Sequence, residues 1–253
     1  MTVLLIDIGN TRIKWARLEG ADLGRAHAAV HAHWGAGHYA RRLLGPRLPG
    51  RILVSSVAGP RVRAALTQAA RAARVPIGFV AVPARGAGIR VGYAEAWRLG
   101  VDRFCGMLAA HRLFPGLPVC VAGVGTALTV DLVARSGRHF GGAIIPGPAL
   151  MVQSLLSGTS GIRRRARGGR RSNRGPFGRS TRDAIEAGAH FAAAALIDRA
   201  VDEGIVLVGR PPLVVLTGGG ADGVRPLLRS PAVGVPDLVL RGLAVLAAQP
   251  PAR

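Results

Sequence analysis

Short apolar runs alternate with amphipathic stretches along the chain, and this alternation predicts an α/β fold. Apolar runs bounded by Gly, Pro, Asn or Asp are typical of strands. They predict strands at 2–7, 12–18, 51–57, 77–82, 118–123, 127–134 and 213–217. Stretches with helical spacing predict helices at 60–74, 101–113, 181–203 and 237–248. Ser180 or Thr181 is the expected N-cap of the long third helix, with Asp183 in its first turn.

Two of the predicted hairpins repeat each other. VLLIDIGNTRIKW at 3–15 aligns with VCVAGVGTALTVD at 119–131, so that Gly9 falls on Gly125 and the apolar strands match on both sides. A chance match is one interpretation, because many β-hairpins have apolar arms and a Gly turn. A duplicated domain is the more specific one, because each hairpin opens one half of an α/β chain.

We therefore predict two halves, 1–115 and 116–253, with a cleft between them. Each half is expected to begin with a hairpin suited to binding phosphate. The repeat also pairs Asp7 of the first hairpin with Gly123 of the second, so only one hairpin carries a carboxylate at this position.

The composition of the chain bears on its expected partners and its expected location in the cell. The formal net charge is +21, with 33 arginines and a single lysine. Abundant Ala, Gly, Arg and Pro with almost no Lys is typical of a GC-rich genome, so this charge is weak evidence for nucleic-acid binding. No apolar stretch is long enough to span a membrane, and the N-terminus lacks the basic region of a signal peptide. Cys105 and Cys120 show no metal-ligand spacing, and we expect a reduced, cytoplasmic location.

One segment has low complexity. GIRRRARGGRRSNRG at 161–175 contains seven arginines, and such a composition predicts a mobile surface loop. The simpler interpretation is a solvated insertion. The functional alternative is contact with phosphate, an acidic partner or, non-specifically, nucleic acid.

The first hairpin contains the pattern Asp-x-Gly-Asn-Thr, whose residues are candidates for binding phosphate and a metal ion. Gly9 allows backbone N–H groups to approach phosphate oxygens, and Asn10 and Thr11 add side-chain donors. Lys14 is the only lysine, and a compact ammonium directed at a phosphate is one need that arginine does not meet. Asp7 is a candidate ligand for hydrated Mg²⁺. An ordinary turn has the same pattern, so further motifs are needed.

Three more motifs follow. GVDR at 100–103 places a carboxylate and a guanidinium together at a predicted helix start, where Asp102 also fits a simple helix cap. GVGTALTVD at 123–131 is a second Gly-Thr turn, and GGAIIPG at 141–147 is an apolar segment punctuated by Gly and Pro.

With these motifs the chain resembles the type III pantothenate kinases, a family in which some members carry the name Bvg accessory factor. The resemblance rests on DIGNTRIK, GVDR, GTALTVD, GGAIIPG, GRSTRDAIEAG and TGGG, in that order, and covers nearly the whole chain. It implies the duplicated fold of actin, sugar kinases and chaperone ATPases. It also implies a homodimeric kinase that uses ATP, Mg²⁺ and a monovalent cation (K⁺ or NH₄⁺) to convert pantothenate to 4′-phosphopantothenate, the first step of coenzyme A biosynthesis.

The resemblance also implies residue roles. Asp102 would accept the proton of the substrate hydroxyl, and TGGG at 217–220 would lie near the adenosine. The ATP-binding residues would be Asp7, Ile8, Gly9, Asn10, Thr11, Arg12, Ile13, Lys14 and Thr126. The pantothenate-binding residues would be Tyr93, Gly100, Val101, Asp102, Arg103 and Thr181. No role follows for His31, His33, His38, His139 or His190.

Two departures from the family leave alternatives open. Gly123 occupies the position where the family usually has an aspartate for the monovalent cation, and the arginine-rich segment replaces the usual sequence after LLSGTS. One alternative is a catalytically weak member that acts as a regulatory or binding protein. Another is a different kinase or a phosphatase on the same fold, although GVDR favours pantothenate.

Overall fold

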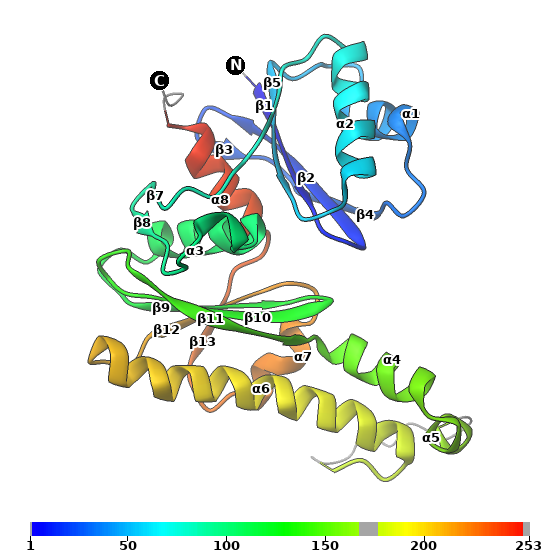
Figure 1. The fold of residues 1–253 in the computed structure, drawn as a ribbon, viewed down its shortest axis with the longest axis vertical. Coiled ribbons are helices and arrows are strands. Elements are labelled where there is room, and N and C mark those ends of the chain that lie inside the picture. Colours follow the sequence, from blue (N-terminus) through cyan, green and yellow to red (C-terminus); the bar gives the residue numbers. More distant parts are fainter. Residues whose placement is uncertain (1, 167–176, 250–253) are drawn as a thin grey trace. The chain divides into compact units, whose positions relative to one another are not determined.

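The computed structural model describes residues 2–166 and 177–249 (Figure 1). It divides into two units, each built around its own sheet. The first unit comprises Met1–Pro115, Ser136–His139 and Asp237–Arg253. The second comprises Gly116–Arg135 and Phe140–Pro236.

The sheet of the first unit has the order β3-β2-β1-β5-β6, with β4 also paired to β2. The hairpin strands β1 and β2 are antiparallel, whereas β5 runs parallel to β1 and β6 parallel to β5. The strands are β1 Thr2–Ile8, β2 Arg12–Glu19, β3 Asp22–Leu23, β4 His27–Val30, β5 Arg51–Ser56 and β6 Ile77–Phe79. A separate short ribbon pairs β7 Arg85–Gly86 with β8 Ile89–Arg90.

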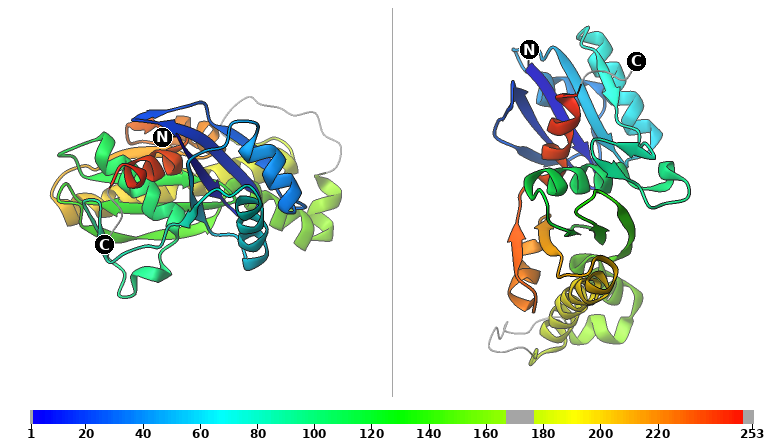
Figure 2. Two further views of the ribbon diagram at one scale, coloured as in Figure 1. Left: turned by 90° about the horizontal axis from the view of Figure 1, so that it is seen from above. Right: turned by 90° about the vertical axis from the view of Figure 1, so that its left-hand side faces the viewer.

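Side chains alternate across β1 and cover both faces of this sheet. Leu4, Ile6 and Ile8 belong to the core formed with α2. The alternate positions face the side on which α8 contacts β1 and β5, and Figure 2 shows α8 beside β1. The helices are α1 Ala36–Tyr39, η1 Ala40–Leu44, α2 Pro60–Ala72, η2 Ala96–Arg98, α3 Val101–Leu113 and α8 Leu238–Ala247.

The sheet of the second unit has the order β11-β10-β9-β12-β13. The long helix α6 packs on it through small and branched residues, among them Ala193, Ala194 and Ile197 (Figure 2). The strands are β9 Val119–Val124, β10 Ala127–Val133, β11 His139–Pro146, β12 Leu213–Thr217 and β13 Ala232–Gly234. The helices are α4 Pro148–Gly158, α5 Ser160–Arg165, α6 Thr181–Val208, α7 Ala221–Val224 and η3 Arg225–Leu227.

The two sheets repeat one topology, which confirms the predicted duplication. In each unit an antiparallel hairpin is extended by two successive parallel strands, β1–β2 with β5 and β6, and β9–β10 with β12 and β13. None of the helices in the described residues has the length and apolar composition that crossing a membrane requires.

Two predictions need correction. The C-terminal helix, counted with the second half from sequence, belongs to the first unit because α8 packs closely on α3; a Cβ at Gly242 would lie 2.0 Å from the Cys105 carbonyl oxygen. The loop predicted at 161–175 is wrong at its start, because Ser160–Arg165 form helix α5. Residues 167–175 lie outside the described part of the chain.

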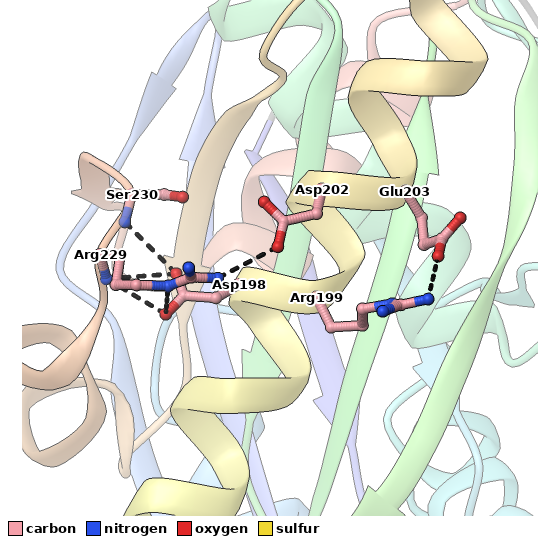
Figure 3. A network of polar contacts seen from close by, with 6 residues as sticks. All are labelled: Asp198, Arg199, Asp202, Glu203, Arg229 and Ser230. Carbon is pink, nitrogen blue, oxygen red and sulfur yellow. Dashed lines mark hydrogen bonds and ion pairs between the residues drawn. The ribbon is translucent and has the colours of Figure 1, made fainter.

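A buried carboxylate fixes α6 to the segment after η3 (Figure 3). Asp198 is 6% exposed, and its side chain accepts hydrogen bonds from the backbone N–H groups of Arg229 (3.2 Å) and Ser230 (3.3 Å). The Arg229 guanidinium reaches both Asp198 and, at 3.1 Å, Asp202. These bonds occupy backbone donors that would otherwise be unpaired.

We predict that Asp198→Ala lowers the free energy of unfolding by about 2–3 kcal/mol, because it leaves backbone donors without their charged acceptor. The matched control is Glu203→Ala on the same helix. Glu203 is exposed and pairs with Arg199, so its loss should cost less than about 1 kcal/mol. Urea denaturation of both variants measures the difference, and equal costs would contradict the structural role of Asp198.

Candidate active site

The turn between β1 and β2 presents polar side chains to solvent. The Gly9 N–H donates to the Arg12 carbonyl oxygen at 3.0 Å and closes the turn. The side chains of Asn10, Thr11 and Arg12 are exposed, whereas the flanking Ile8 and Ile13 are fully buried. The hairpin is therefore anchored by its apolar ends and leaves its tip open to a ligand.

A histidine supports this turn from within. His31 is 3% exposed, and its Nε2 lies 2.8 Å from the Gly9 carbonyl oxygen. Because a carbonyl oxygen only accepts, Nε2 carries the proton and donates it. Nδ1 then accepts from the Tyr39 hydroxyl at 3.4 Å. The sequence assigned no role to His31, because its partners lie on other elements.

Asp7 is the central carboxyl group of the first unit. In the sheet it pairs directly with Lys14 on β2 and with Ser55 on β5, whose hydroxyl donates to Asp7 Oδ1 at 3.3 Å. The pKa of Asp7 is raised to about 7, first by burial and then by the negative charges of Asp102 and Asp237, while Lys14 and the Ser55 hydroxyl act in the opposite direction.

The single lysine has a partner that the sequence did not indicate. Lys14 Nζ lies 3.3 Å from Asp237 Oδ1, and both side chains are about one-third exposed, at 31% and 29%. Asp237 is the N-cap position of α8 and has a left-handed backbone with φ of 55°, which Asp tolerates better than most residues. A pattern of hydrophobic spacing predicts the helix but not this contact.

The carboxyl groups fit a hydrated magnesium ion. Among the described residues no three His, Cys, Asp or Glu side chains gather closely enough to hold a metal by themselves. Magnesium prefers one or two carboxylates together with water and phosphate oxygens. The pKa of Asp7 is raised by burial and, after that, by the negative charges of Asp102 and Asp237, so a cation beside this carboxyl group would be favoured.

The motif GVDR forms the beginning of α3. Gly100 is the N-cap position and makes no side-chain cap hydrogen bond of its own. Asp102 lies in the first turn, where its Oδ1 accepts from the Arg103 backbone N–H at 2.9 Å. A Cβ at Gly100 would lie 2.6 Å from Asp102 Oδ1, so glycine makes room for this conformation. Asp102 therefore pairs a backbone donor in the first turn of α3, as the cap interpretation predicts, and its carboxylate also lies at the positive end of the helix.

Arg103 and Tyr93 meet beside Asp102. The Arg103 side chain is largely buried, and its Nη1 donates to the Tyr93 hydroxyl at 3.0 Å. The guanidinium carbon also lies 5.6 Å from the centre of the Tyr93 ring. Two residues predicted to bind the same substrate thus contact each other in the first unit.

The second unit joins three of the sequence motifs at the end of β9. The Gly125 N–H donates to the Ala127 carbonyl at 3.0 Å and closes a turn with Thr126 exposed at its tip. The Gly147 N–H donates to the Thr126 carbonyl at 2.8 Å, and a Cβ at Gly147 would lie 2.0 Å from the Gly125 oxygen. The glycine that ends GGAIIPG is therefore required by close packing.

The TGGG motif approaches the same strand end. Gly218 has φ of +96°, and a Cβ there would lie 2.3 Å from the Val124 carbonyl oxygen. That oxygen accepts from the Gly220 N–H at 3.0 Å. Backbone rather than side chains lines this part of the unit, which is typical of loops that bind phosphate or nucleotide closely.

Two further predicted residues lie elsewhere in the second unit. Gly123 pairs with Thr129 and Thr217, and a Cβ on Gly123 would lie 3.0 Å from Thr129 Oγ1. Thr181 is the first residue of α6, but Ser180 caps the helix by accepting from the Asp183 N–H at 3.1 Å. The capping alternative therefore applies to Ser180, and Thr181 is not needed for that purpose.

Comparison with solved structures identifies the fold class. A Baf family transcriptional activator from Campylobacter jejuni is 18% identical, with 96% of this chain and 97% of that chain covered and a TM-score of 0.62. A ROK family glucokinase from Streptomyces griseus is 11% identical, with 97% and 99% covered and a TM-score of 0.56. The fold is that of the actin-like ATPases and sugar kinases, as the sequence predicted.

Comparison with known sequences identifies the family. The family profile described as type III pantothenate kinase matches residues 3–203. A type III pantothenate kinase from Nitrosococcus oceani is 36% identical over 255 residues, which cover 97% of this chain and 93% of that protein. The chain belongs to the type III pantothenate kinase family and is a kinase.

The raised pKa of Asp7 makes stability depend on pH. The group holds its proton up to about pH 7 when folded but only to about 3.8 when unfolded, so stability should fall as pH rises from about 4 to 7. Asp7→Asn should remove this fall and make the protein more stable than wild type at pH 8, by on the order of 3 kcal/mol. Urea denaturation at pH 5 and pH 8 measures it.

The control for that experiment is Asp22→Asn, which changes an exposed carboxylate in the same sheet. It should keep the wild-type pH dependence. Equal slopes for the wild type and Asp7→Asn would show that Asp7 is not the group responsible.

Proposed function

We propose that this protein transfers the γ-phosphoryl group of ATP to pantothenate, giving 4′-phosphopantothenate in the first step of coenzyme A biosynthesis. Membership of the family over nearly the whole chain supports this proposal. The observation that carries it is the placement of Asp102 and Lys14 around the partly buried carboxyl group of Asp7. This cluster supplies a base and a cation within one unit.

The first hairpin is the proposed phosphate-binding element. Its open tip allows backbone N–H groups and the side chains of Asn10 and Thr11 to reach phosphate oxygens. Lys14, held by Asp237 at 3.3 Å, neutralises phosphate charge as a compact ammonium that needs less room than a guanidinium. The proposed ATP-binding residues are Asp7, Ile8, Gly9, Asn10, Thr11, Arg12, Ile13 and Lys14, with Thr126 of the second unit.

Asp102 is the proposed base. Phosphoryl transfer has a loose transition state, so catalysis depends on positioning and charge neutralisation more than on early proton removal. Asp102 accepts the proton of the substrate hydroxyl on its carboxylate as the new oxygen–phosphorus bond forms and the bond from the γ-phosphorus to the departing ADP breaks. The other proposed pantothenate-binding residues are Tyr93, Gly100, Val101, Arg103 and Thr181.

Asp7 is the residue proposed to hold Mg²⁺ through its water shell. When bound, the ion would offset the negative charge of the phosphates. Deprotonation of Asp7, whose pKa is about 7, frees its carboxylate for that role, and the Ser55 hydroxyl keeps one carboxylate oxygen oriented.

A monovalent cation is not expected to be required. At the position where the family usually has an aspartate, Gly123 offers only a backbone carbonyl, and its neighbours across the sheet are the neutral Thr129 and Thr217. A cation there would lack a charged ligand. We therefore propose activity that is independent of potassium or ammonium.

Assembly and location are also proposals. A homodimer is supported by apolar side chains exposed on the second unit, including Ile144 at 57%, Leu155 at 41% and Leu150 at 37%. A cytoplasmic setting is supported by Cys105 and Cys120, which are buried thiols without a disulfide in the described residues. Nucleic acid is not a proposed partner beyond non-specific contact by the arginine-rich segment.

Asp102→Asn should fold normally and lose most turnover, by about 10²–10⁴-fold. The amide keeps the shape of the side chain but does not accept the hydroxyl proton. Formation of phosphopantothenate from ATP and pantothenate is measured, and the thermal unfolding midpoint confirms folding. A folded variant with a kcat close to wild type would exclude Asp102 as the base.

The wild-type rate should change less than about twofold when potassium is titrated, because Gly123 removes the charged cation ligand. Gly123→Asp should create potassium activation if Thr129 moves aside to admit the new side chain. Gly59→Asp, which adds a carboxylate where a Cβ meets open space, is the control and should stay indifferent. Strong potassium activation of the wild type would show that other ligands form the site.

A further inference from the structure

His139 is a buried histidine outside the proposed chemistry. It is 1% exposed, and its Nδ1 accepts from the Gly92 backbone N–H at 3.3 Å. This contact places the proton of the neutral ring on Nε2. The ring orientation is therefore fixed by the backbone immediately before Tyr93.

The same ring stacks on Tyr93. The ring centroids are 5.9 Å apart and the planes differ by 19°, a geometry typical of attractive stacking. Tyr93 in turn accepts from Arg103 at 3.0 Å through its hydroxyl. A continuous set of contacts thus leads from His139 through Tyr93 to Arg103.

His139 lies beside Tyr93 because the turn from β10 to β11 is bonded to the β7–β8 ribbon that precedes Tyr93 in the chain. The Arg90 N–H donates to the Gly137 carbonyl at 2.9 Å. Gly137 has φ of +79°, and a Cβ on it would lie 1.8 Å from the Gly88 oxygen. Close backbone contact between Gly88 and Gly137 therefore determines how near the following His139 lies to Tyr93.

We infer that His139 is a positioning residue for the acceptor substrate. It holds the plane of Tyr93, and Tyr93 holds the guanidinium of Arg103 in the orientation that receives the acceptor. The inference rests on the proposed function, in which Tyr93 and Arg103 bind pantothenate. It assigns His139 an effect on the affinity for pantothenate and none on the affinity for ATP.

Variants that separate the two contacts test this. His139→Asn keeps an acceptor for the Gly92 N–H but loses the stacked ring, and His139→Phe keeps a stacking ring but loses the acceptor. Each should raise the KM for pantothenate by about three- to tenfold, with a KM for ATP within about twofold of wild type. Tyr93→Phe, which removes the hydroxyl that Arg103 contacts, should change the KM for pantothenate in the same direction.

The matched control is His33→Asn, because His33 is an exposed histidine in the same unit. It should leave both KM values unchanged. Equal increases in the KM for pantothenate and ATP in the His139 variants would indicate general loosening of the fold and would overturn the inference.

A spectroscopic readout tests the positioning without relying on turnover. The chain has two tyrosines, so 3-fluorotyrosine labelling gives two ¹⁹F resonances, and Tyr93→Phe assigns them. His139→Asn should shift the Tyr93 resonance and leave that of Tyr39 in place. An unchanged Tyr93 resonance would overturn the inference even if KM changes.

The two proposals fail in different ways. A wild-type enzyme that phosphorylates pantothenate, with unchanged KM values in the His139 variants, would overturn the inference and leave the function standing. A wild-type chain without pantothenate phosphorylation would overturn the function and, with it, the acceptor named here. The fluorine measurement would still show whether His139 contacts Tyr93 in solution.

Discussion

The partly buried carboxyl group of Asp7 is the constraint on which the polar interior of the first unit depends. A carboxyl group at the edge of a core needs partners, because burial alone disfavours its charge. Those partners come from different elements: Lys14 from β2 and Ser55 from β5, with Asp237 at the start of α8 balancing Lys14. The register of the sheet brings Lys14 and Ser55 to Asp7, and the packing of α8 in the first unit brings Asp237 to Lys14.

The two copies of the duplicated hairpin differ in the side chains they carry. In the first unit, the row across the sheet contains Asp7, Lys14 and Ser55, which is charged and suited to a cation and phosphates. In the second unit, the equivalent row contains the small, neutral Gly123 with two threonines. Its glycine-rich loops instead pack backbone closely against backbone at the end of β9. The same topology therefore places charged side chains at the hairpin of one unit and closely packed glycines at the hairpin of the other. Phosphoryl transfer requires both positioning and charge neutralisation.

The sequence by itself determined the fold class, the duplication and the central strands of both sheets, but it did not indicate the strand β11 or the helix α4. The helix expected at 101–113 is α3 with the same bounds, and the strand expected at 213–217 is β12. The motif residues around Asp7 and Asp102 were also visible, because hydrophobic periodicity and turn residues encode local structure directly. The loop prediction failed at its start, since arginines and glycine suggested a loop whereas Ser160–Arg165 form a short helix.

Only the tertiary structure decided which distant residues become partners. Asp237 reaches Lys14 across nearly the whole chain, His31 supports the Gly9 turn, and His139 stacks on Tyr93. In the sequence, nothing around Asp237, His31 or His139 distinguishes them from ordinary residues that cap a helix or fill a core. Their roles depend on how elements pack and on close glycine contacts, which are long-range properties. Periodicity in a sequence specifies which face of an element is buried, but it does not specify which side chain will meet it there.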